Sequence, residues 1–301
     1  MMLIAGTVPI KELPLVTGEV RAEGDSLVIG GYPVPCAQGT GAMISAAQAT
    51  TGYLELNSPQ VVVAGDIGEG KGSRKIYEYL IQNVARLSPR VLALHYLLPD
   101  MALMRQLCQA VKDCHPRPLM IADAGSMYAA KAAGLATEFD IFTPDITELA
   151  FLADEEATHP AYISRHLFCA DITRPPRLII DAYRHRSAAR LLLVKGATDY
   201  IARRDGEILA TVTEPSVPEL EAIGGTGDTI TGLVAAFVAS GLELHEAAII
   251  AARANRTAGR LARVTVASGV KQIISQFPAV FKEYLCAWSG VCLMKGGGYC
   301  E

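Results

Sequence analysis

The residues that most clearly could do chemistry form a glycine-rich turn that opens directly into a helix. Gly224-Gly225-Thr226-Gly227-Asp228 precedes a segment in which apolar residues recur at helical spacing, and Gly241 is placed to end that helix. Glycine lets a backbone approach a ligand closely, and the unpaired amides and dipole of a helix N-terminus favour an anion such as phosphate. The sequence therefore predicts a phosphate-binding turn over residues 224–228.

Asp228 lies inside this turn, where its negative charge would repel an anion unless the carboxylate accepts a proton. That placement favours a general base next to a phosphoryl group in transfer. Aspartate is also a favoured N-cap residue, so helix capping is the alternative role. Because four small residues in front of the aspartate exceed what a cap needs, we prefer the catalytic interpretation.

Short apolar runs alternate with helical patterns from about residue 26 to residue 270, and these elements must position the turn. Such alternation predicts an α/β fold, a three-layer α/β/α sandwich with a mostly parallel central sheet. Asp205-Gly206 predicts one antiparallel hairpin. We expect a single catalytic domain over 1–277 and a loosely attached C-terminal tail over 278–301. The expected strands are 26–29, 61–64, 91–94, 119–122, 141–143, 191–194, 200–203 and 208–213, and the expected helices are 41–50, 73–87, 100–113, 149–153, 176–189, 245–264 and 270–285.

Polar and glycine-rich turns follow the carboxyl ends of the expected strands, which is where ligands gather in such sheets. We expect these turns to surround the same cleft as residues 224–228. They are Gly30-Gly31, 65–68, Asp123-Ala124-Gly125, Pro144-Asp145 and Lys195-Gly196-Ala197.

A second glycine-rich segment, residues 65–73, nearly matches a P-loop between a strand and a helix. The position after Lys71 must be Ser or Thr to hold magnesium, and here it is Gly72. We prefer a flexible turn that lines the cleft, with a P-loop nucleotidase as the alternative.

Asp145 and Glu148 begin an expected helix and have two possible roles. Both can serve as the N-terminal charges that a helix dipole favours. Alternatively, Glu148 orders a water or a magnesium ion near nucleotide phosphates, because hard cations prefer carboxylate oxygen. Asp123, at the end of a strand, has the same ambiguity.

The composition indicates a globular chain with no footprint for nucleic acid or membranes. Of 301 residues, 50% are hydrophobic and 19% charged, and the formal net charge is −4. This balance disfavours nucleic acid and anionic membranes as partners. No stretch approaches the ~18 apolar residues of a membrane span, and residues 1–9 lack a signal-peptide pattern. We expect a cytoplasmic protein.

Cysteine and histidine form no recognisable metal pattern. The seven cysteines lack CxxC spacing, so reduced thiols are expected, and a metal site among Cys286, Cys292 and Cys300 is disfavoured because no histidine follows them. Solvent exposure or helix capping is expected for each histidine. These are His95, His115, His159, His166, His185 and His245.

Taken together, these segments resemble the ribokinase-like superfamily, and within it the ADP- or ATP-dependent NAD(P)H-hydrate dehydratases, over roughly residues 25–265. The most specific match is the 224–228 turn, which is similar to the family's nucleotide-site loop with its catalytic aspartate. Residues 26–31 look like the family's opening strand and glycine turn. The other similar segments are 39–43, 61–68, 118–124 and 194–197.

The resemblance implies roles for individual residues and a homo-oligomeric assembly. It implies that Asp228 is the base and that the amides of Gly225, Thr226 and Gly227 form an anion hole. By the same resemblance, the nucleotide would be bound by Lys195, Gly196, Gly224 and Asn255, the substrate by Gly31, Gly41, Asp66, Gly68, Asp123 and Asp145, and Mg²⁺ by Glu148.

Departures from the family pattern fall in the turns that would face the substrate. Where the dehydratases read Thr-Pro-His-Pro-Gly-Glu, residues 143–148 read Thr-Pro-Asp-Ile-Thr-Glu, and the Gly-Pro-Gly-Leu-Gly turn is altered at 65–68. Gly125 stands where the family's Asp-Ala-Asp element ends. Kinases of the superfamily carry Asn-x-x-Glu near the phosphates, and Asp145-x-x-Glu148 is also a variant of that motif.

Three functions remain open from the sequence. The first is an ATP- or ADP-dependent enzyme that phosphorylates a substrate hydroxyl and then eliminates phosphate, as in the hydrate dehydratases. The second is a kinase of a sugar or vitamin-type small molecule that stops at the phosphate ester. The third is a nucleotide-binding regulator without catalysis, which the charge of Asp228 disfavours.

Overall fold

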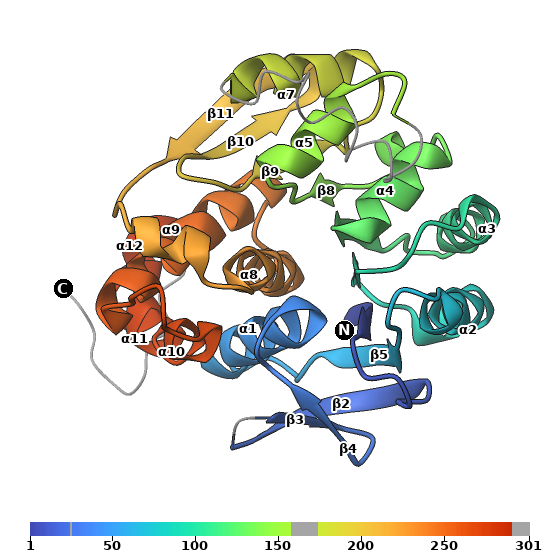
Figure 1. The fold of residues 1–301 in the computed structure, drawn as a ribbon, viewed down its shortest axis with the longest axis horizontal. Coiled ribbons are helices and arrows are strands. Elements are labelled where there is room, and N and C mark those ends of the chain that lie inside the picture. Colours follow the sequence, from blue (N-terminus) through green and yellow to red (C-terminus); the bar gives the residue numbers. More distant parts are fainter. Residues whose placement is uncertain (25, 158–173, 291–301) are drawn as a thin grey trace.

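A single eleven-stranded sheet runs through the part of the chain that the computed structural model describes, residues 1–24, 26–157 and 174–290 (Figure 1). The strand order is β11-β10-β9-β8-β7-β6-β1-β5-β2-β3-β4. The strands are β1 (Met2–Val8), β2 (Val16–Glu23), β3 (Ser26–Ile29), β4 (Tyr32–Pro35), β5 (Gln60–Gly65), β6 (Val91–His95), β7 (Leu119–Asp123), β8 (Ile141–Phe142), β9 (Leu191–Val194), β10 (Asp199–Arg203) and β11 (Glu207–Val212).

Helices cover both faces of this sheet, as Figure 1 shows. One face carries α1 (Gly39–Tyr53), α8 (Thr226–Ser240), α9 (Leu244–Ala262), α10 (Val270–Ile274) and α11 (Phe277–Val280). The other carries α2 (Lys71–Leu87), α3 (Met101–Lys112), α4 (Gly125–Ala132), α5 (Ile146–Ala153) and α7 (Pro175–Arg184). Shorter elements are α12 (Cys286–Ser289), η1 (Ala136–Glu138), η3 (Arg204–Gly206), η4 (Pro218–Ala222) and η5 (Phe281–Leu285). The predicted three-layer α/β/α architecture is confirmed.

The middle of the sheet is parallel and its edges are antiparallel. β1 pairs with β5 and β6 in parallel, and the parallel pairing continues through β7, β8 and β9. All seven residues of β1 are buried, and side chains alternate between the layers, with Ile4 in one core and Leu3 and Ala5 in the other. A strand covered on both faces reads as a continuous apolar run.

The opening strand of the parallel sheet is β1, so the prediction that residues 26–31 open it is wrong. Ser26–Ile29 pairs antiparallel with β2 and β4 at the sheet edge, and Gly30-Gly31 is the tight turn between β3 and β4. From the sequence, residues 1–9 were weighed only as a targeting segment, so the apolar run of β1 was not recognised as a buried strand.

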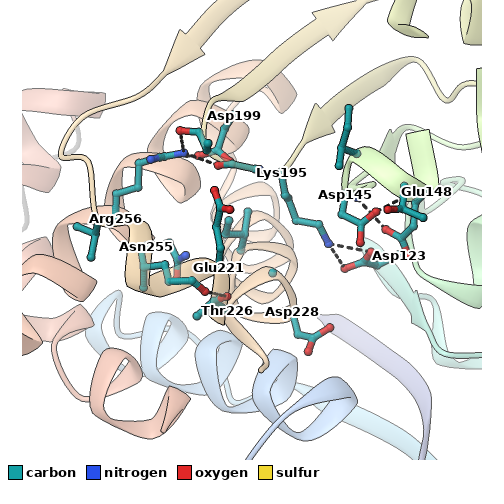
Figure 2. A pocket seen from close by; sticks show the side chains of 18 of the residues that line it. Asp123, Asp145, Glu148, Lys195, Asp199, Glu221, Thr226, Asp228, Asn255 and Arg256 are labelled. Carbon is teal, nitrogen blue, oxygen red and sulfur yellow. Dashed lines mark hydrogen bonds and ion pairs between the residues drawn. The ribbon is translucent and has the colours of Figure 1, made fainter. Parts of the chain in front are cut away.

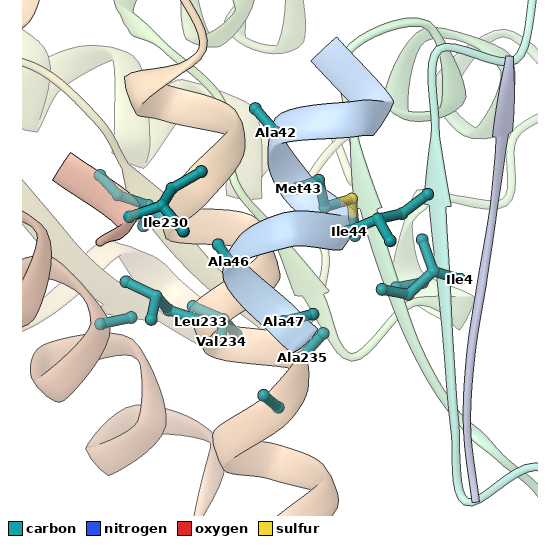
Figure 3. Packing of buried hydrophobic residues seen from close by; sticks show 14 of the residues in the cluster. Ile4, Ala42, Met43, Ile44, Ala46, Ala47, Ile230, Leu233, Val234 and Ala235 are labelled. Carbon is teal, nitrogen blue, oxygen red and sulfur yellow. The ribbon is translucent and has the colours of Figure 1, made fainter. Parts of the chain in front are cut away.

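Helices α1 and α8 pack unusually close together because small residues face each other (Figure 3). A Cβ built on Gly232 of α8 would lie 2.2 Å from the carbonyl oxygen of Met43 in α1. Ala42, Ala46 and Ala235 are fully buried in the same region. This contact brings the N-termini of the two helices together, which matters for the site below.

The chain beyond residue 277 belongs to the core rather than to a loose tail. Phe281 is buried, and its ring packs against Tyr53, Phe237 and Phe277. Val280 and Leu285 are buried in the same cluster. The predicted boundary at residue 278 therefore marks no change in packing, because these apolar side chains cover α1 and α9. Residues 291–301 lie outside the described residues.

The expected reduced state of all cysteines is wrong at Cys286, which is disulfide-bonded. Cys292 and Cys300 lie outside the described residues. Among the described helices, none combines the length and the apolarity that crossing a bilayer requires.

Candidate active site

The predicted phosphate-binding turn forms the N-terminus of α8. Gly225 is the N-cap with a φ of 95°, and a Cβ on it would lie 3.0 Å from Cα of Gln38, so only glycine fits. The Thr226 hydroxyl donates to the carbonyl of Leu220 at 2.9 Å and holds the turn. The Thr226 amide donates to Ile223 at 3.4 Å. The first-turn amide of Gly227 has no carbonyl one turn earlier in the helix to accept it, so it can serve an anion.

Asp228 does not cap α8. Its Oδ2 accepts from the amide of Gly39 at the start of α1 at 2.7 Å, and its Oδ1 lies 2.9 Å from Nε2 of His95. Burial would raise the pKa of Asp228, but the hydrogen bond and charge of His95, the charge of Lys195 and the Gly39 amide together lower it. Asp228 is therefore an ionised carboxylate beside the turn, and the capping alternative is wrong.

Lys195 and Asp123 form a buried ion pair next to this turn (Figure 2). Nζ of Lys195 donates to both carboxylate oxygens of Asp123, at 2.8 and 3.0 Å, and Thr231 donates to the same carboxylate at 2.5 Å. A Cβ on Gly227 would lie 3.4 Å from Nζ, so the ammonium group is adjacent to the first turn of α8. Burial would lower the pKa of Lys195, but the nearby carboxylates outweigh it and raise the pKa.

The cation and the helix N-terminus face a cavity of about 480 Å³, a size in the usual range of small-ligand sites. Apolar residues Val217, Pro218 and Leu220 line it together with the polar groups. Of the residues that the sequence analysis assigned to a site, the structure brings nine to this cavity. They are Asp123, Asp145, Glu148, Lys195, Gly196, Thr226, Gly227, Asp228 and Asn255.

The other assigned residues do not line the cavity. Gly224 and Gly225 lie behind the turn against Gln38. Gly31, with a φ of 86°, is in the β3–β4 turn. Gly41 is a packing glycine, because a Cβ there would lie 2.0 Å from the carbonyl oxygen of Pro35.

Asp66 fills the P-loop-like turn with its own carboxylate. Oδ1 accepts from the amides of Gly68, Glu69 and Gly70 at 3.0 Å each, and Oδ2 accepts from the amide and hydroxyl of Ser73. The amides that a phosphate would need are already used. The P-loop alternative is therefore wrong, and neither Asp66 nor Gly68 reaches the cavity.

Asp145 and Glu148 form a reciprocal capping box at the start of α5. Asp145 Oδ1 accepts from the Glu148 amide at 2.7 Å, and Glu148 Oε2 accepts from the Asp145 amide at 2.8 Å. The capping role that the sequence left open is confirmed, although both residues also line the cavity.

Any magnesium ion bound by Glu148 would have to displace the proton that the raised pKa of this carboxyl retains. Desolvation of the carboxyl and then the charge of Asp123 raise the pKa of Glu148 to about 8, although the residue keeps part of its surface exposed. A carboxyl that holds its proton at neutral pH offers a weak bond to a hard cation. The Mg²⁺ assignment stays a prediction, and no step below depends on it.

His95 is the site residue that the sequence analysis misjudged. It ends β6, it is fully buried, and it contacts Asp228. The exposure or capping expected of histidines is confirmed for His115, His185 and His245, with Nδ1 of His185 donating to the carbonyl of Ala153 at the end of α5. His159 and His166 lie outside the described residues. The position of His95 at a strand end, like Asp123, was the available signal.

Asp199 and Arg256 were also missed, and they hold the turn after β9. Nε of Arg256 donates to Asp199 at 2.7 Å, and Nη2 donates to the carbonyls of Gly196 and Ala197 at 2.7 and 3.0 Å. This buried pair fixes the backbone next to Lys195. Asn255, the neighbour of Arg256 on α9, accepts from the Thr229 hydroxyl at 2.7 Å and links α9 to α8.

Two residues with unusual backbone conformations adjoin the site. Tyr96, after His95, has a φ of 52°, and Ala124, after Asp123, has a φ of 49°. Such conformations are costly for residues other than glycine and cluster at functional sites. Both residues line the cavity.

Comparisons with known proteins show the family to which the chain belongs. A carbohydrate kinase family model, described as NAD(P)H-hydrate dehydratase, matches residues 91–274. An uncharacterized protein of Methanocaldococcus jannaschii is 36% identical over 81% of this chain and all of its own length. The ADP-dependent (S)-NAD(P)H-hydrate dehydratase of Xanthomonas campestris is 25% identical over 82% of this chain and 78% of its own.

A likeness to solved structures extends to kinases. Bacillus subtilis pyridoxal kinase, solved as an ADP complex, has a TM-score of 0.52 and 14% sequence identity, with 83% of this chain and 88% of that chain covered. That identity supports the fold alone, which is ribokinase-like. The family match covers more than half of the chain, and the chain belongs to the NAD(P)H-hydrate dehydratase family with a ribokinase-like fold.

Proposed function

We propose that this protein is an ATP- or ADP-dependent enzyme that phosphorylates a hydroxyl group of NAD(P)H hydrate and then eliminates phosphate to return NAD(P)H. The observation that carries the proposal is the ionised Asp228 between the amides of α8 and a nucleotide-sized cavity. The family match supports the same reaction.

The nucleotide would bind with its terminal phosphates at the N-terminus of α8. Lys195 and the first-turn amides of α8 supply the positive charge that attracts phosphate. The apolar side chains of Val217, Pro218 and Leu220 offer a surface for the nucleobase. Asp123 holds the Lys195 ammonium in place and is itself held by the Thr231 hydroxyl, so no reorganisation is needed when phosphate arrives.

Asp228 would act as the general base for phosphoryl transfer. The substrate oxygen forms a bond to the terminal phosphorus, the bond from that phosphorus to the rest of the nucleotide breaks, and the hydroxyl proton moves to Asp228. Each carboxylate oxygen of Asp228 makes one hydrogen bond to the protein and retains a lone pair for the substrate. In the second stage the new phosphate ester leaves as inorganic phosphate.

A kinase that stops at the ester is the second candidate. The turns that differ from the dehydratase pattern, 65–68 and 143–148, are those expected to face the substrate. Asp145 and Glu148 are committed to a capping box rather than to a Thr-Pro-His-Pro-Gly-Glu turn.

The deciding experiment incubates the protein with NADH hydrate and either ATP or ADP, and records NADH absorbance and phosphate release together. The dehydratase proposal requires nucleotide-dependent NADH formation with phosphate released in equal amount. Asp228→Asn should abolish both signals, whereas Asp205→Asn, in the exposed hairpin turn after β10, should not. A stable phosphorylated product without NADH would identify a kinase instead, and no reaction with either nucleotide would reject the dehydratase.

A further inference from the structure

His95 is a buried ionisable residue for which the proposed reaction has no role yet. Its Nε2 lies 2.9 Å from Oδ1 of Asp228, and its Nδ1 lies 2.9 Å from Oγ1 of Thr40. The Thr40 hydroxyl in turn donates to the carbonyl oxygen of Thr7 at 2.6 Å. Three elements, β1, β6 and the start of α1, therefore contribute to one hydrogen-bonded chain that ends on the proposed base.

The hydrogen-bonded chain from Thr7 to Asp228 fits only because position 6 is a glycine. A Cβ built on Gly6 would lie 2.8 Å from Oγ1 of Thr40 and 2.5 Å from the carbonyl oxygen of His95. Any other residue at position 6 would push the strand away from the Thr40–His95 contact. On the other side, the His95 ring meets Tyr96 edge-on, with centroids 4.4 Å apart.

Counting protons along this chain fixes the state of the imidazole. A hydroxyl has one proton, and the carbonyl of Thr7 can only accept, so the proton of Thr40 points to Thr7. Nδ1 of His95 must then donate to Thr40. An ionised carboxylate also only accepts, so Nε2 must donate to Asp228.

The surrounding charges are compatible with a second buried cation at this point. The charged and titratable groups near His95 are Asp228 on α8, Asp123 at the end of β7, Lys195 after β9, Tyr96 beside it and Glu148 on α5. Oδ2 of Asp123 lies 3.9 Å from Nε2. Two carboxylates therefore face two cations, so the cluster carries no net charge that burial would penalise strongly.

We propose that His95 is a positioning residue for Asp228, held as an imidazolium by Thr40, and that it keeps the carboxylate ionised and aims its free lone pairs at the cavity. This inference rests on the proposed function only in assigning Asp228 as the base; the protonation of His95 follows from the hydrogen bonds together with the ionised state of Asp228. The direction of the Asp228 pKa, which His95 lowers against the effect of burial, agrees with it.

The first test needs neither nucleotide nor substrate. Histidine-labelled protein is examined by long-range ¹H–¹⁵N NMR at neutral pH, and His95 is assigned by the loss of its signals in His95→Gln. Both ring nitrogens of His95 should show the shifts of protonated nitrogen. In Thr40→Val, which removes the acceptor for Nδ1, the ring should lose a proton. A neutral His95 in the unmodified protein, with one unprotonated nitrogen, would overturn the proposal.

The second test uses the pH dependence of kcat/KM. Glutamine at position 95 can still donate to Asp228 but carries no charge, so the pKa of Asp228 should rise, and an opposite charge at this distance typically accounts for one to three units. The ratio of kcat/KM for His95→Gln to that for the unmodified protein should therefore fall between pH 8 and pH 5.5, by up to about tenfold. Taking the ratio removes the titration of Glu148, Tyr96 and the nucleotide, which both proteins share.

His245→Gln, an exposed histidine on α9, is the matched control and should give a ratio that does not depend on pH. A pH-independent loss of activity in His95→Gln would mean that His95 only fills space, and would reject the proposal. If the NMR result is as expected but the protein transfers no phosphoryl group, the proposed function fails while the protonation of His95 stands. Should the His95 variant not fold, the signals of His95 are assigned as those that change in Thr40→Val, because His95 is the histidine that contacts Thr40, and the NMR readout still decides the question.

Discussion

At the scale of single residues, the site consists of four neighbouring ionisable side chains, of which three are buried and Asp228 is partly exposed. Nitrogen–oxygen ion-pair contacts join Asp228 to His95, His95 to Asp123, and Asp123 to Lys195. Removing charges from water is costly, and buried ion pairs often contribute little net stability. The gathering of these ionisable groups beside one cavity therefore indicates a role in binding or catalysis rather than in stability.

Substitutions of the Lys195–Asp123 pair allow the contribution of a buried ion pair to the free energy of unfolding to be measured. Lys195→Met leaves Asp123 buried without its main partner, and breaking such a pair typically costs about 3–5 kcal/mol of unfolding free energy. Adding Asp123→Asn removes the unpaired charge, so the double variant should be more stable than Lys195→Met alone. Urea unfolding of both variants tests this. Equal or lower stability of the double variant would show that Asp123 does not depend on Lys195.

Glu148 should give the protein a distinctive pH dependence. Its folded pKa of about 8 lies above its ordinary value of 4.5, so the folded state holds a proton that the unfolded state loses between these values. The stabilisation is complete below pH 4.5 and is lost as pH rises towards 8. Glu148→Gln keeps the capping box but has no proton to lose. The difference between the melting temperature of Glu148→Gln and that of the unmodified protein should therefore shift in favour of the variant as pH rises from 5 to 8. Glu12→Gln, at an exposed position, is the control, and a constant difference for Glu148→Gln would contradict the raised pKa.

At the scale of elements, the contact of α1 with α8 determines where the proposed base lies. Gly39 at the start of α1 donates to Asp228 in the first turn of α8. Gly232, one helix turn further along α8, allows the close approach. A change in helix spacing would therefore alter the hydrogen bonds of Asp228 without touching the cavity.

Gly232→Ala tests this coupling. The added Cβ would meet the Met43 carbonyl at 2.2 Å, and overpacking of this kind costs about 1–3 kcal/mol. We expect lower stability together with a lower kcat. Gly52→Ala in α1 is the matched control, because a Cβ there meets nothing within 4 Å, and it should be neutral or stabilising by up to ~1 kcal/mol. Equal effects of the two substitutions would contradict the packing account.

Elements with a clear periodicity could be predicted from the sequence, whereas those defined by long-range packing could not. The amphipathic α2 and α3 and the strands β5, β6, β7 and β9 lie within a few residues of the expected ranges. β1 was missed because its apolar run includes Gly6 and Thr7 and lies in the segment that was weighed only as a targeting signal. The core position of residues 278–285 was missed because it depends on packing against distant aromatic residues, Tyr53 and Phe237, which contact Phe281.

The parts of the candidate site that lie within a local sequence motif could be predicted from the sequence. The 224–228 turn and Lys195 follow from glycine spacing and strand ends. The roles of His95, Arg256 and Asp66 depend on partners 133, 57 and at most 7 residues away in the chain. Asp66 was misjudged even at short range, because the pattern of a P-loop does not reveal that a carboxylate already occupies the turn.

At the scale of the whole molecule, the sheet topology gathers the chemistry at one edge. β6, β7 and β9 end in or beside His95, Asp123 and Lys195, and their parallel pairing through β8 aligns their carboxyl ends. α8, which follows the antiparallel β10–β11 excursion, then brings Asp228 to the same edge. Residues from four distant parts of the sequence meet only because the sheet is parallel there.

The most direct test of this account is Asp228→Asn, measured for turnover and nucleotide binding on the same preparation. Loss of a general base typically lowers the rate by ~10² to 10⁴, whereas nucleotide affinity should hold or improve because a negative charge beside phosphate is removed. The fold should survive, since asparagine can still accept from the Gly39 amide. We therefore expect a large fall in kcat with Kd for ATP or ADP within a few fold. Unchanged turnover, or loss of the cooperative unfolding transition, would contradict the assignment of Asp228 as the base.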